Sequence, residues 1–257
     1  MKLLTVALIT GATLFFQSAN AQTLKIASDA SYPPFSYIDS NNELQGFDID
    51  ISHALCKKMN VTCTIMTQDF EGMIPGLLAK KYDAIISSLA PTQERLQKID
   101  FTDPYYHTEL ALIVTKDSGI KEMIAQAFKG RNLGVQSNTT QAAYAEDHYA
   151  SEGVNVKLYP TIIEVNRDLL SHRLDMMICD KIQALNWLEK EGKDCCKLLG
   201  TLEKTKSPIA IALRKNNNDL KNKFNKAIKE IHMDGTYDKI MKKYFTFDIH
   251  ERSYVQN

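Results

Sequence analysis

The sequence predicts an α/β protein built as two lobes joined by two crossings of the chain, and three observations predict it. Short apolar runs alternate with amphipathic helical stripes over 24–88 and again over 110–190. Such alternation favours parallel sheets covered by crossover helices. Polar residues follow several predicted strands, and a further strand over 209–213 has too few partners to form a third unit. We therefore expect that strand to return to the first lobe, which makes the second crossing.

The first unit has the order strand, helix, strand, helix, strand. Phe47, Ile51, Leu55 and Met59 form one apolar stripe at helical spacing. The expected elements are a strand over 24–28, a rigid loop over 29–35 with two prolines, a helix over 47–59, a strand over 63–66, a helix over 70–80 and a strand over 82–87.

The second unit repeats this alternation, and two further helices follow the returning strand. A break at Asp234 and Gly235 separates those last helices, because glycine suits the position after a helix end. The expected elements are strands over 110–115, 132–136, 156–159 and 176–179, and helices over 122–128, 140–149, 162–171, 182–190 and, in two parts, 220–244.

Residues 1–21 have the features of a secretory signal peptide. Lys2 precedes an apolar run over 3–16, and small residues at 19–21 suit a cleavage site. We expect export to the periplasm of a chain over 22–257, with lobe 1 formed by 22–108 plus 209–257 and lobe 2 by 109–208. Without Lys2 the 31 basic residues become 30 against 31 acidic ones, a formal charge of −1. That balance argues against nucleic acid and anionic membranes as partners.

Five cysteines are present in a chain expected to reach an oxidising compartment. Cys56 and Cys63 bracket a helix end and a strand start, and closing so short a loop would contribute about 2–3 kcal/mol. For Cys179, Cys195 and Cys196 we expect two buried thiols and one exposed thiol, with a second bridge involving Cys179 as the alternative. Because no histidine lies at ligand spacing, a zinc site is not expected.

The stretch 85–95 places polar groups at the carboxyl end of a short buried strand. The strand ends in Ser87 and Ser88, Pro91 breaks it, and a helical turn then brings in Arg95. Ligands of open α/β sheets bind at such strand ends, and a guanidinium suits a carboxylate or phosphate. The alternative is a surface arginine beside an ordinary strand-to-helix turn.

Six motifs occur in a characteristic order: SDASYPPF (28–35), GFDID (46–50), DAIISS (83–88), ER (94–95), FTDPYY (101–106) and DGTYDKI (234–240). This set closely resembles the periplasmic solute-binding proteins of amino-acid ABC transporters, solute-binding protein family 3. The nearest pattern is the lysine/arginine/ornithine- and histidine-binding group, over essentially the whole mature chain. The resemblance implies the two-lobed periplasmic binding protein fold (type II), with a ligand cleft between the lobes, and a disulfide between Cys56 and Cys63. It also implies a monomer that uses no cofactor. This monomer would deliver an amino acid to a membrane permease and catalyse no reaction.

The resemblance assigns five residues to the main-chain groups of the ligand. Arg95 would bind the α-carboxylate, together with the N–H of Ala90 and with Thr140 at a helix N-terminus. Asp180 of lobe 2 would bind the α-ammonium, assisted by Ser88.

The resemblance also assigns residues to the ligand side chain, and these favour a cationic one. Tyr32 and Phe70 would sandwich it, and aromatic faces suit a guanidinium or imidazolium. Asp29 would meet the distal positive charge and disfavour a neutral side chain. The remaining assigned residues are Ser87 beside Asp29, and Gln136 and Gln141 in lobe 2.

Each assignment has a plainer alternative when it stands alone. Asp29 would be a turn aspartate, Tyr32 a loop-packing residue, Phe70 a hydrophobic staple and Asp180 a helix cap.

Three departures from the family pattern affect the expected site. Ala90 replaces a frequent hydroxyl and removes one donor, on the order of 1 kcal/mol. Asn138 replaces a glycine, although asparagine also tolerates a positive φ. The crossing over 202–209 is short and lacks glycines.

Gln136, where arginine-binding relatives tend to be polar, favours arginine over lysine, ornithine or histidine.

Two other functions fit the same resemblance. One is an exported enzyme of the cyclohexadienyl dehydratase type, whose acidic substrates Asp29 would repel. The other is a sensor or host-interaction protein that uses the same pocket to bind an amino acid.

Overall fold

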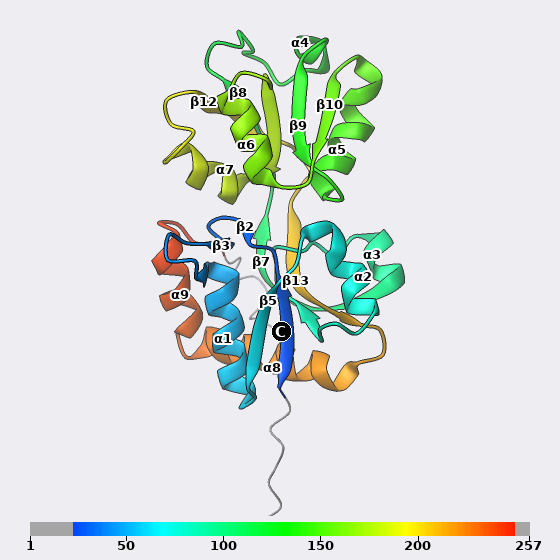
Figure 1. The fold of residues 1–257 in the computed structure, drawn as a ribbon, viewed down its shortest axis with the longest axis vertical. Helices are drawn as coiled ribbons and strands as arrows, with labels where there is room; N and C mark the ends of the chain where they lie inside the picture. The colour runs from blue at the N-terminus through cyan, green and yellow to red at the C-terminus, as the bar shows by residue number, and fades with distance from the viewer. Residues whose placement is uncertain (1–22, 250–257) are drawn as a thin grey trace, which may run out of the picture.

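The computed structural model describes residues 23–249, which form two lobes stacked along the long axis of the molecule (Figure 1). This confirms the predicted two-lobed α/β fold. The predicted signal peptide over 1–21 lies outside the described residues. Within 23–249, no helix combines the length and apolarity needed to cross a bilayer.

Lobe 1 is built on a five-stranded sheet in the order β5-β1-β6-β13-β7. A small three-stranded sheet, β2-β3-β4, lies within the predicted loop after β1 and just beyond it. The strands are β1 (Leu24–Ser28), β2 (Ser31–Tyr32), β3 (Ser36–Ile38), β4 (Leu44–Gln45), β5 (Cys63–Thr67), β6 (Ala84–Ile85), β7 (Ile99–Thr108) and β13 (Ser207–Arg214). The helices are α1 (Phe47–Met59), the 3₁₀ turn η1 (Phe70–Gly72), α2 (Met73–Leu78), α3 (Gln93–Lys98), α8 (Asn218–Met233) and α9 (Thr236–Tyr244).

Lobe 2 is built on a second five-stranded sheet in the order β10-β9-β11-β8-β12. Its strands are β8 (Leu110–Thr115), β9 (Asn132–Gln136), β10 (Asn155–Tyr159), β11 (Met176–Asp180) and β12 (Cys196–Thr201). Its helices are α4 (Ala125–Phe128), α5 (Thr140–Tyr149), the 3₁₀ turn η2 (Ala150–Glu152), α6 (Ile162–Leu170) and α7 (Lys181–Leu188).

Both sheets are mixed, which corrects the expectation of purely parallel sheets. In lobe 1, β5, β1 and β6 are parallel, whereas β13 runs antiparallel to both β6 and β7. Lobe 2 has the same plan, with β8 antiparallel to β11 and β12. The reason is that β7 and β13 carry the chain out of lobe 1 and back into it, so they run in opposite directions. The strand expected over 82–87 is also shorter, since only Ala84–Ile85 pairs.

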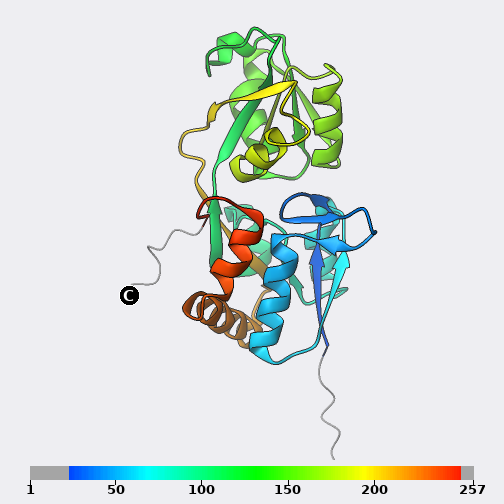
Figure 2. The ribbon, with the colours of Figure 1, turned by 90° about the vertical axis from the view of Figure 1, so that its left-hand side faces the viewer.

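Two adjacent segments connect the lobes, from β7 to β8 and from β12 to β13 (Figures 1 and 2). Hydrogen bonds tie the second segment to the first. The N–H of Leu110 donates to Thr205 Oγ1 at 3.0 Å, and the N–H of Leu202 donates to the Leu110 carbonyl at 2.8 Å. Thr205 Oγ1 in turn donates to the Leu202 carbonyl at 2.7 Å. The short crossing that lacks glycines is therefore held by the threonine hydroxyl.

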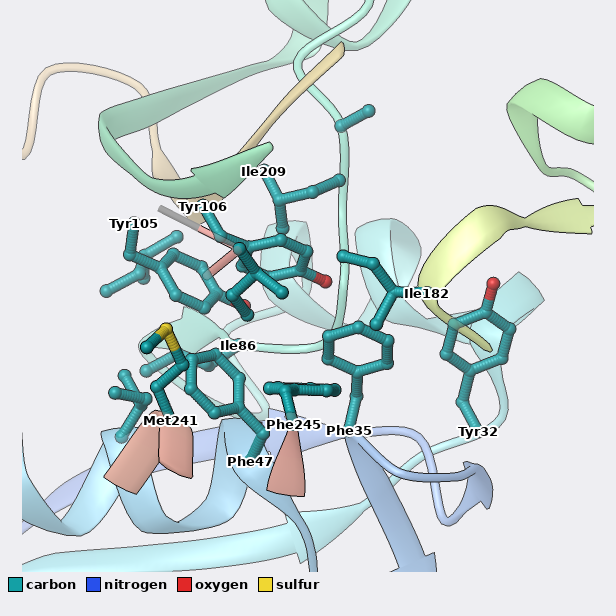
Figure 3. Close-up of a cluster of buried hydrophobic side chains, with 14 of the residues drawn as sticks. Tyr32, Phe35, Phe47, Ile86, Tyr105, Tyr106, Ile182, Ile209, Met241 and Phe245 are labelled. Atoms are coloured by element: carbon teal, nitrogen blue, oxygen red, sulfur yellow. The ribbon is translucent and has the colours of Figure 1, made fainter. Parts of the chain in front are cut away.

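A buried aromatic cluster lies in lobe 1 beneath the junction with lobe 2 (Figure 3). The Phe35 ring stacks on Tyr106 with centroids 5.1 Å apart, and Phe47 at the start of α1 packs edge-on against Phe245 at 5.3 Å. Figure 3 shows Ile182 of α7 in lobe 2 between Phe35 and Tyr32. The core of lobe 1 thus continues into the contact between the lobes.

The cysteines correct one expectation. Cys56, near the end of α1, is bonded to Cys63 at the start of β5, as the resemblance implied. Cys195 and Cys196, however, form a disulfide with each other, and Cys179 in β11 is a buried free thiol. The three are therefore not two buried thiols and one exposed thiol. Adjacent cysteines can pair without any other part of the fold, so burial gave no signal of this bond.

Candidate ligand-binding cleft

One cavity between the lobes brings together all eleven side chains that the sequence singled out. Four of them follow or end the parallel strands β1, β6, β9 and β11, whose carboxyl ends point toward the junction between the lobes. The predicted residues that line the cavity are Asp29, Tyr32, Phe70, Ser87, Ser88, Ala90, Arg95, Gln136, Thr140, Gln141 and Asp180.

The cavity has further lining residues that sequence reasoning missed. Most of them belong to the two crossings, which carry no motif of their own. They are Thr108, Leu110, Thr139, Thr205, Ser207 and Ile209. A polar residue at the end of a strand was the signal that identified other cavity residues. It would also have identified Thr108 if β7 had been predicted as a strand.

Asp29, which follows β1, is a buried carboxylate that faces both lobes. Its Oδ1 accepts hydrogen bonds from the Ser31 N–H at 2.9 Å and the Ser31 hydroxyl at 2.7 Å. Gln136 of lobe 2 donates to Oδ2 at 3.5 Å, and the N–H of Asp29 donates to Ser87 Oγ at 2.9 Å. Burial raises the pKa of Asp29, and the bonds from Ser31 and Gln136 offset part of that shift. Within the described residues, no lysine or arginine therefore forms an ion pair with this carboxylate.

Asp180, at the end of β11, is the second buried carboxylate of the cavity. The Tyr32 hydroxyl donates to its Oδ2 at 2.6 Å, across the boundary between the lobes. Burial raises the pKa of Asp180 to about 6, although hydrogen bonds from Tyr32, Gln141 and Thr108 and the charge of Arg95 act in the opposite direction.

Arg95 lies where the lobes meet, at the outer end of the cavity. Its short helix α3 is capped by Thr92, whose hydroxyl accepts from the Arg95 N–H at 3.2 Å. The guanidinium donates to the Ala90 carbonyl at 2.8 Å and to the Asn138 carbonyl of lobe 2 at 3.0 Å. The Phe70 ring faces it, with 5.7 Å from Cζ to the ring centroid. Burial lowers the pKa of Arg95 to about 10, so it stays charged at neutral pH.

Ser88 is held in place by a buried carboxylate that sequence reasoning did not assign to the site. Its backbone has φ +48°, and its N–H donates to Asp48 Oδ2 at 2.8 Å. Its hydroxyl donates to the same oxygen at 3.2 Å and accepts from Tyr106 at 2.7 Å. Burial raises the pKa of Asp48 to about 7, against the hydrogen bonds from Tyr105 and Ser88. The GFDID motif at the start of α1 contains Asp48 and was the sequence signal that could have identified it.

The start of α5 forms the wall of lobe 2 nearest Arg95. Thr139, not Thr140, caps the helix, because its hydroxyl accepts from the Ala142 N–H at 3.1 Å. Thr140 and Gln141 are therefore in the first turn, where N–H groups have no acceptor within the helix. Asn138 has φ +59°, the left-handed conformation that allows asparagine in place of glycine.

The charges of the cavity suit a ligand with two positive groups and one carboxylate. The two buried carboxylates of the protein can each pair with a positive group, and Arg95 with the start of α5 can pair with the ligand carboxylate. Within residues 23–249, no three His, Cys, Asp or Glu side chains are grouped as a metal site would require.

Comparisons with known proteins identify the family of the chain. The family model described as bacterial extracellular solute-binding proteins, family 3, matches residues 24–247. The chain is 40% identical over 253 residues to the lysine/arginine/ornithine-binding periplasmic protein of Escherichia coli strain K12, covering 96% of each chain. It is 38% identical over 256 residues to the histidine-binding periplasmic protein of Salmonella typhimurium strain LT2, covering 95% of this chain and 98% of the relative.

Among solved structures, the protein is similar to an ancestral arginine-binding protein bound to arginine. The TM-score is 0.82 at 35% sequence identity, covering 87% of this chain and 98% of the other. The family-model match over residues 24–247 extends across both lobes and both crossings. The chain therefore belongs to the bacterial extracellular solute-binding proteins, family 3.

Proposed function

We propose that this protein is the periplasmic solute-binding component of an ABC importer and that it binds a cationic L-amino acid, arginine before lysine, ornithine or histidine. The observation that carries the proposal is the pair of buried carboxylates, Asp29 and Asp180, in a cavity that also contains Arg95. Burying a carboxylate is costly unless a cation or several donors compensate for lost water. A zwitterion with a cationic side chain supplies one positive group to each carboxylate.

The main-chain groups of the ligand have partners at the outer end of the cavity. Arg95 binds the α-carboxylate together with the N–H groups at the start of α5, including that of Thr140. The guanidinium has five N–H donors, of which the bonds to Ala90 and Asn138 use two. Asp180 binds the α-ammonium, and Ser88 contributes its hydroxyl.

The side chain of the ligand lies between the aromatic rings of Tyr32 and Phe70 and reaches Asp29. Gln136 supports arginine in particular, because its amide lies beside the Asp29 carboxylate and offers an oxygen to a guanidinium N–H that Asp29 leaves unbonded. Ser87 and Gln141 complete the lining. The relatives named for lysine, arginine, ornithine and histidine, and the similar structure bound to arginine, support this ligand class.

The cellular setting rests on the same proposal. The leader over 1–21 directs export, and the periplasmic relatives support the periplasm as the location. The lobe bounds of 22–108 plus 209–257 and of 109–208 stay predictions. In our proposal a monomer delivers its ligand to a membrane permease. The chain performs no chemistry of its own.

Uptake of labelled arginine tests this role in cells. Deletion of the gene is expected to reduce uptake at low arginine concentration, and the wild-type gene is expected to restore it. Unchanged uptake would contradict the transport role and favour a sensor that acts through a partner. Conversion of prephenate by the purified protein would instead assign it to the dehydratases.

A further inference from the structure

A second, outer groove adjoins the ligand cavity at the end where the α-carboxylate is proposed to bind. The groove has a volume of about 960 Å³, within the range of pockets that hold small ligands. Helices α2 and α3 of lobe 1 and α5 of lobe 2 border it, and Figure 1 shows them on the same side of the molecule. Phe70, Arg95, Thr139 and Thr140 line both spaces, so the groove is continuous with the cavity.

The walls of the groove combine apolar side chains with charged ones, the latter being Glu71, Glu94, Arg95, Lys98 and Glu146. Leu78 of α2 and Leu158 of β10 face it from opposite lobes and are 48% and 51% exposed, among the most exposed large hydrophobic side chains of residues 23–249. Ile74 and Pro75 of α2 add further apolar surface. Exposed apolar side chains gathered at a groove commonly mark a binding surface.

One hydrogen bond between the lobes lies where the groove and the cavity share Arg95. Arg95 of lobe 1 donates to the Asn138 carbonyl of lobe 2 at 3.0 Å. A peptide unit has one acceptor and one donor on opposite sides, so it can bridge these two groups once the lobes separate enough to break their direct bond. Its carbonyl would accept from Arg95, and its N–H would donate to the Asn138 carbonyl. The carboxylate of a free amino acid satisfies only the first of these partners.

We infer that the protein also binds dipeptides that have a basic first residue and an apolar second residue, such as arginyl-leucine. This inference rests on the proposed function, because the basic residue occupies the amino-acid cavity, with its α-ammonium on Asp180 and its side chain toward Asp29. The peptide unit lies between Arg95 and Asn138. The second side chain packs against Leu158 and Leu78, and its carboxylate stays near the remaining guanidinium N–H groups.

Calorimetric titration of the whole protein with L-arginine, Arg-Leu and Leu-Arg tests the inference. Arg-Leu is expected to bind about 10- to 100-fold more weakly than arginine, because a neutral carbonyl replaces a carboxylate at Arg95. Leu-Arg is expected to bind far more weakly still, since leucine would then face Asp29. Mass spectrometry of the bound ligand checks that Arg-Leu is recovered intact.

Two matched substitutions locate the second residue of the peptide. Leu158→Asp is expected to weaken Arg-Leu about tenfold or more and to leave arginine unchanged, because Leu158 lines only the groove. Ile163→Asp changes a side chain of similar exposure, 43%, outside the groove, and is expected to alter neither ligand.

Each contrary outcome has a separate meaning. If arginine binds but Arg-Leu does not, or if Leu158→Asp leaves Arg-Leu binding intact, the dipeptide inference is wrong and the proposed function stands. If neither arginine nor Arg-Leu binds, the proposed function fails and this inference fails with it.

Discussion

The surroundings of single residues explain why we propose different roles for the two carboxylates of the cavity. Asp29 is surrounded by small neutral donors, which support a negative charge without neutralising it. Asp180 has partners from both lobes, among them Tyr32 and the positive charge of Arg95. We therefore assign selectivity for a cationic side chain to Asp29, and capture of the α-ammonium together with lobe closure to Asp180.

The first prediction concerns Asp29→Asn. The variant is expected to lose about 2–5 kcal/mol of binding free energy for arginine, because truncating a buried charge pair leaves the ligand cation without its partner. Calorimetric titration measures the loss. Asp103→Asn, at an exposed position of β7, is the matched control and is expected to bind normally. Equal affinity of Asp29→Asn and wild type would place Asp29 outside the binding site.

A second prediction concerns pH. Since the pKa of Asp180 is raised to about 6, the group is ionised above that pH and protonated below it. The ligand α-ammonium binds only the ionised form, so arginine affinity is expected to fall about tenfold from pH 7 to pH 5. Asp180→Asn should bind weakly, with a flatter profile. Affinity that rises on acidification would contradict this role of Asp180.

The same shift affects folding stability, with a sign that can be checked. An unfolded aspartate titrates near pH 3.9, so between about pH 4 and 6 the unfolded chain releases the Asp180 proton before the folded chain does. The contribution of this group therefore lowers the stability of the folded protein as pH rises through that window. Denaturant titrations of the wild type and Asp180→Asn, compared at pH 4 and pH 7, measure it.

At the scale of helices and strands, regular spacing of apolar residues was the reliable signal in the sequence. The sequence predicted the full extent of α1, Phe47–Met59, from the apolar stripe along it. In the structure Asn60 ends the helix in a left-handed conformation. It missed β7, where Pro104 and acidic residues interrupt the alternation, and β12, which contains Gly200. Both strands are specified by pairing with partners distant in sequence.

The same distinction applies to the cleft. Residues at the ends of regular strands, such as Asp29 and Asp180, could be found from local pattern and resemblance. Thr205 could not, because its role comes from a hydrogen bond to Leu110 in the other crossing. Asp48 was visible as part of a motif, but its contact with Ser88 depends on how α1 packs against the carboxyl end of β6.

The disulfide between Cys56 and Cys63 supports an element-scale prediction. It joins the end of α1 to the start of β5, away from the cleft. Replacing both cysteines by alanine is expected to lower the free energy of unfolding by about 2–3 kcal/mol, from the lost restriction of the unfolded chain. Urea titration measures the loss, and arginine affinity serves as the control that should not change. Unchanged stability would show that the pair provides no such restraint.

At the scale of the whole molecule, we expect the cleft to couple ligand binding to the relative position of the lobes. Several hydrogen bonds at the cavity cross between the lobes, among them Tyr32 to Asp180, Arg95 to the Asn138 carbonyl, and Gln136 to Asp29. A ligand that contacts both lobes adds to this set and favours the closed arrangement. We propose that the two adjacent crossings between the lobes (Figure 2) act as the hinge for this motion.

The central claim is that the cavity selects an amino acid with a positively charged side chain. Calorimetric titration of ligand-free protein with arginine, lysine, ornithine, histidine and glutamine tests it most directly. We predict tight binding at one site per chain for the cationic ligands, with arginine tightest and glutamine far weaker. A preference for glutamine, or no binding of any of the five, would contradict the account.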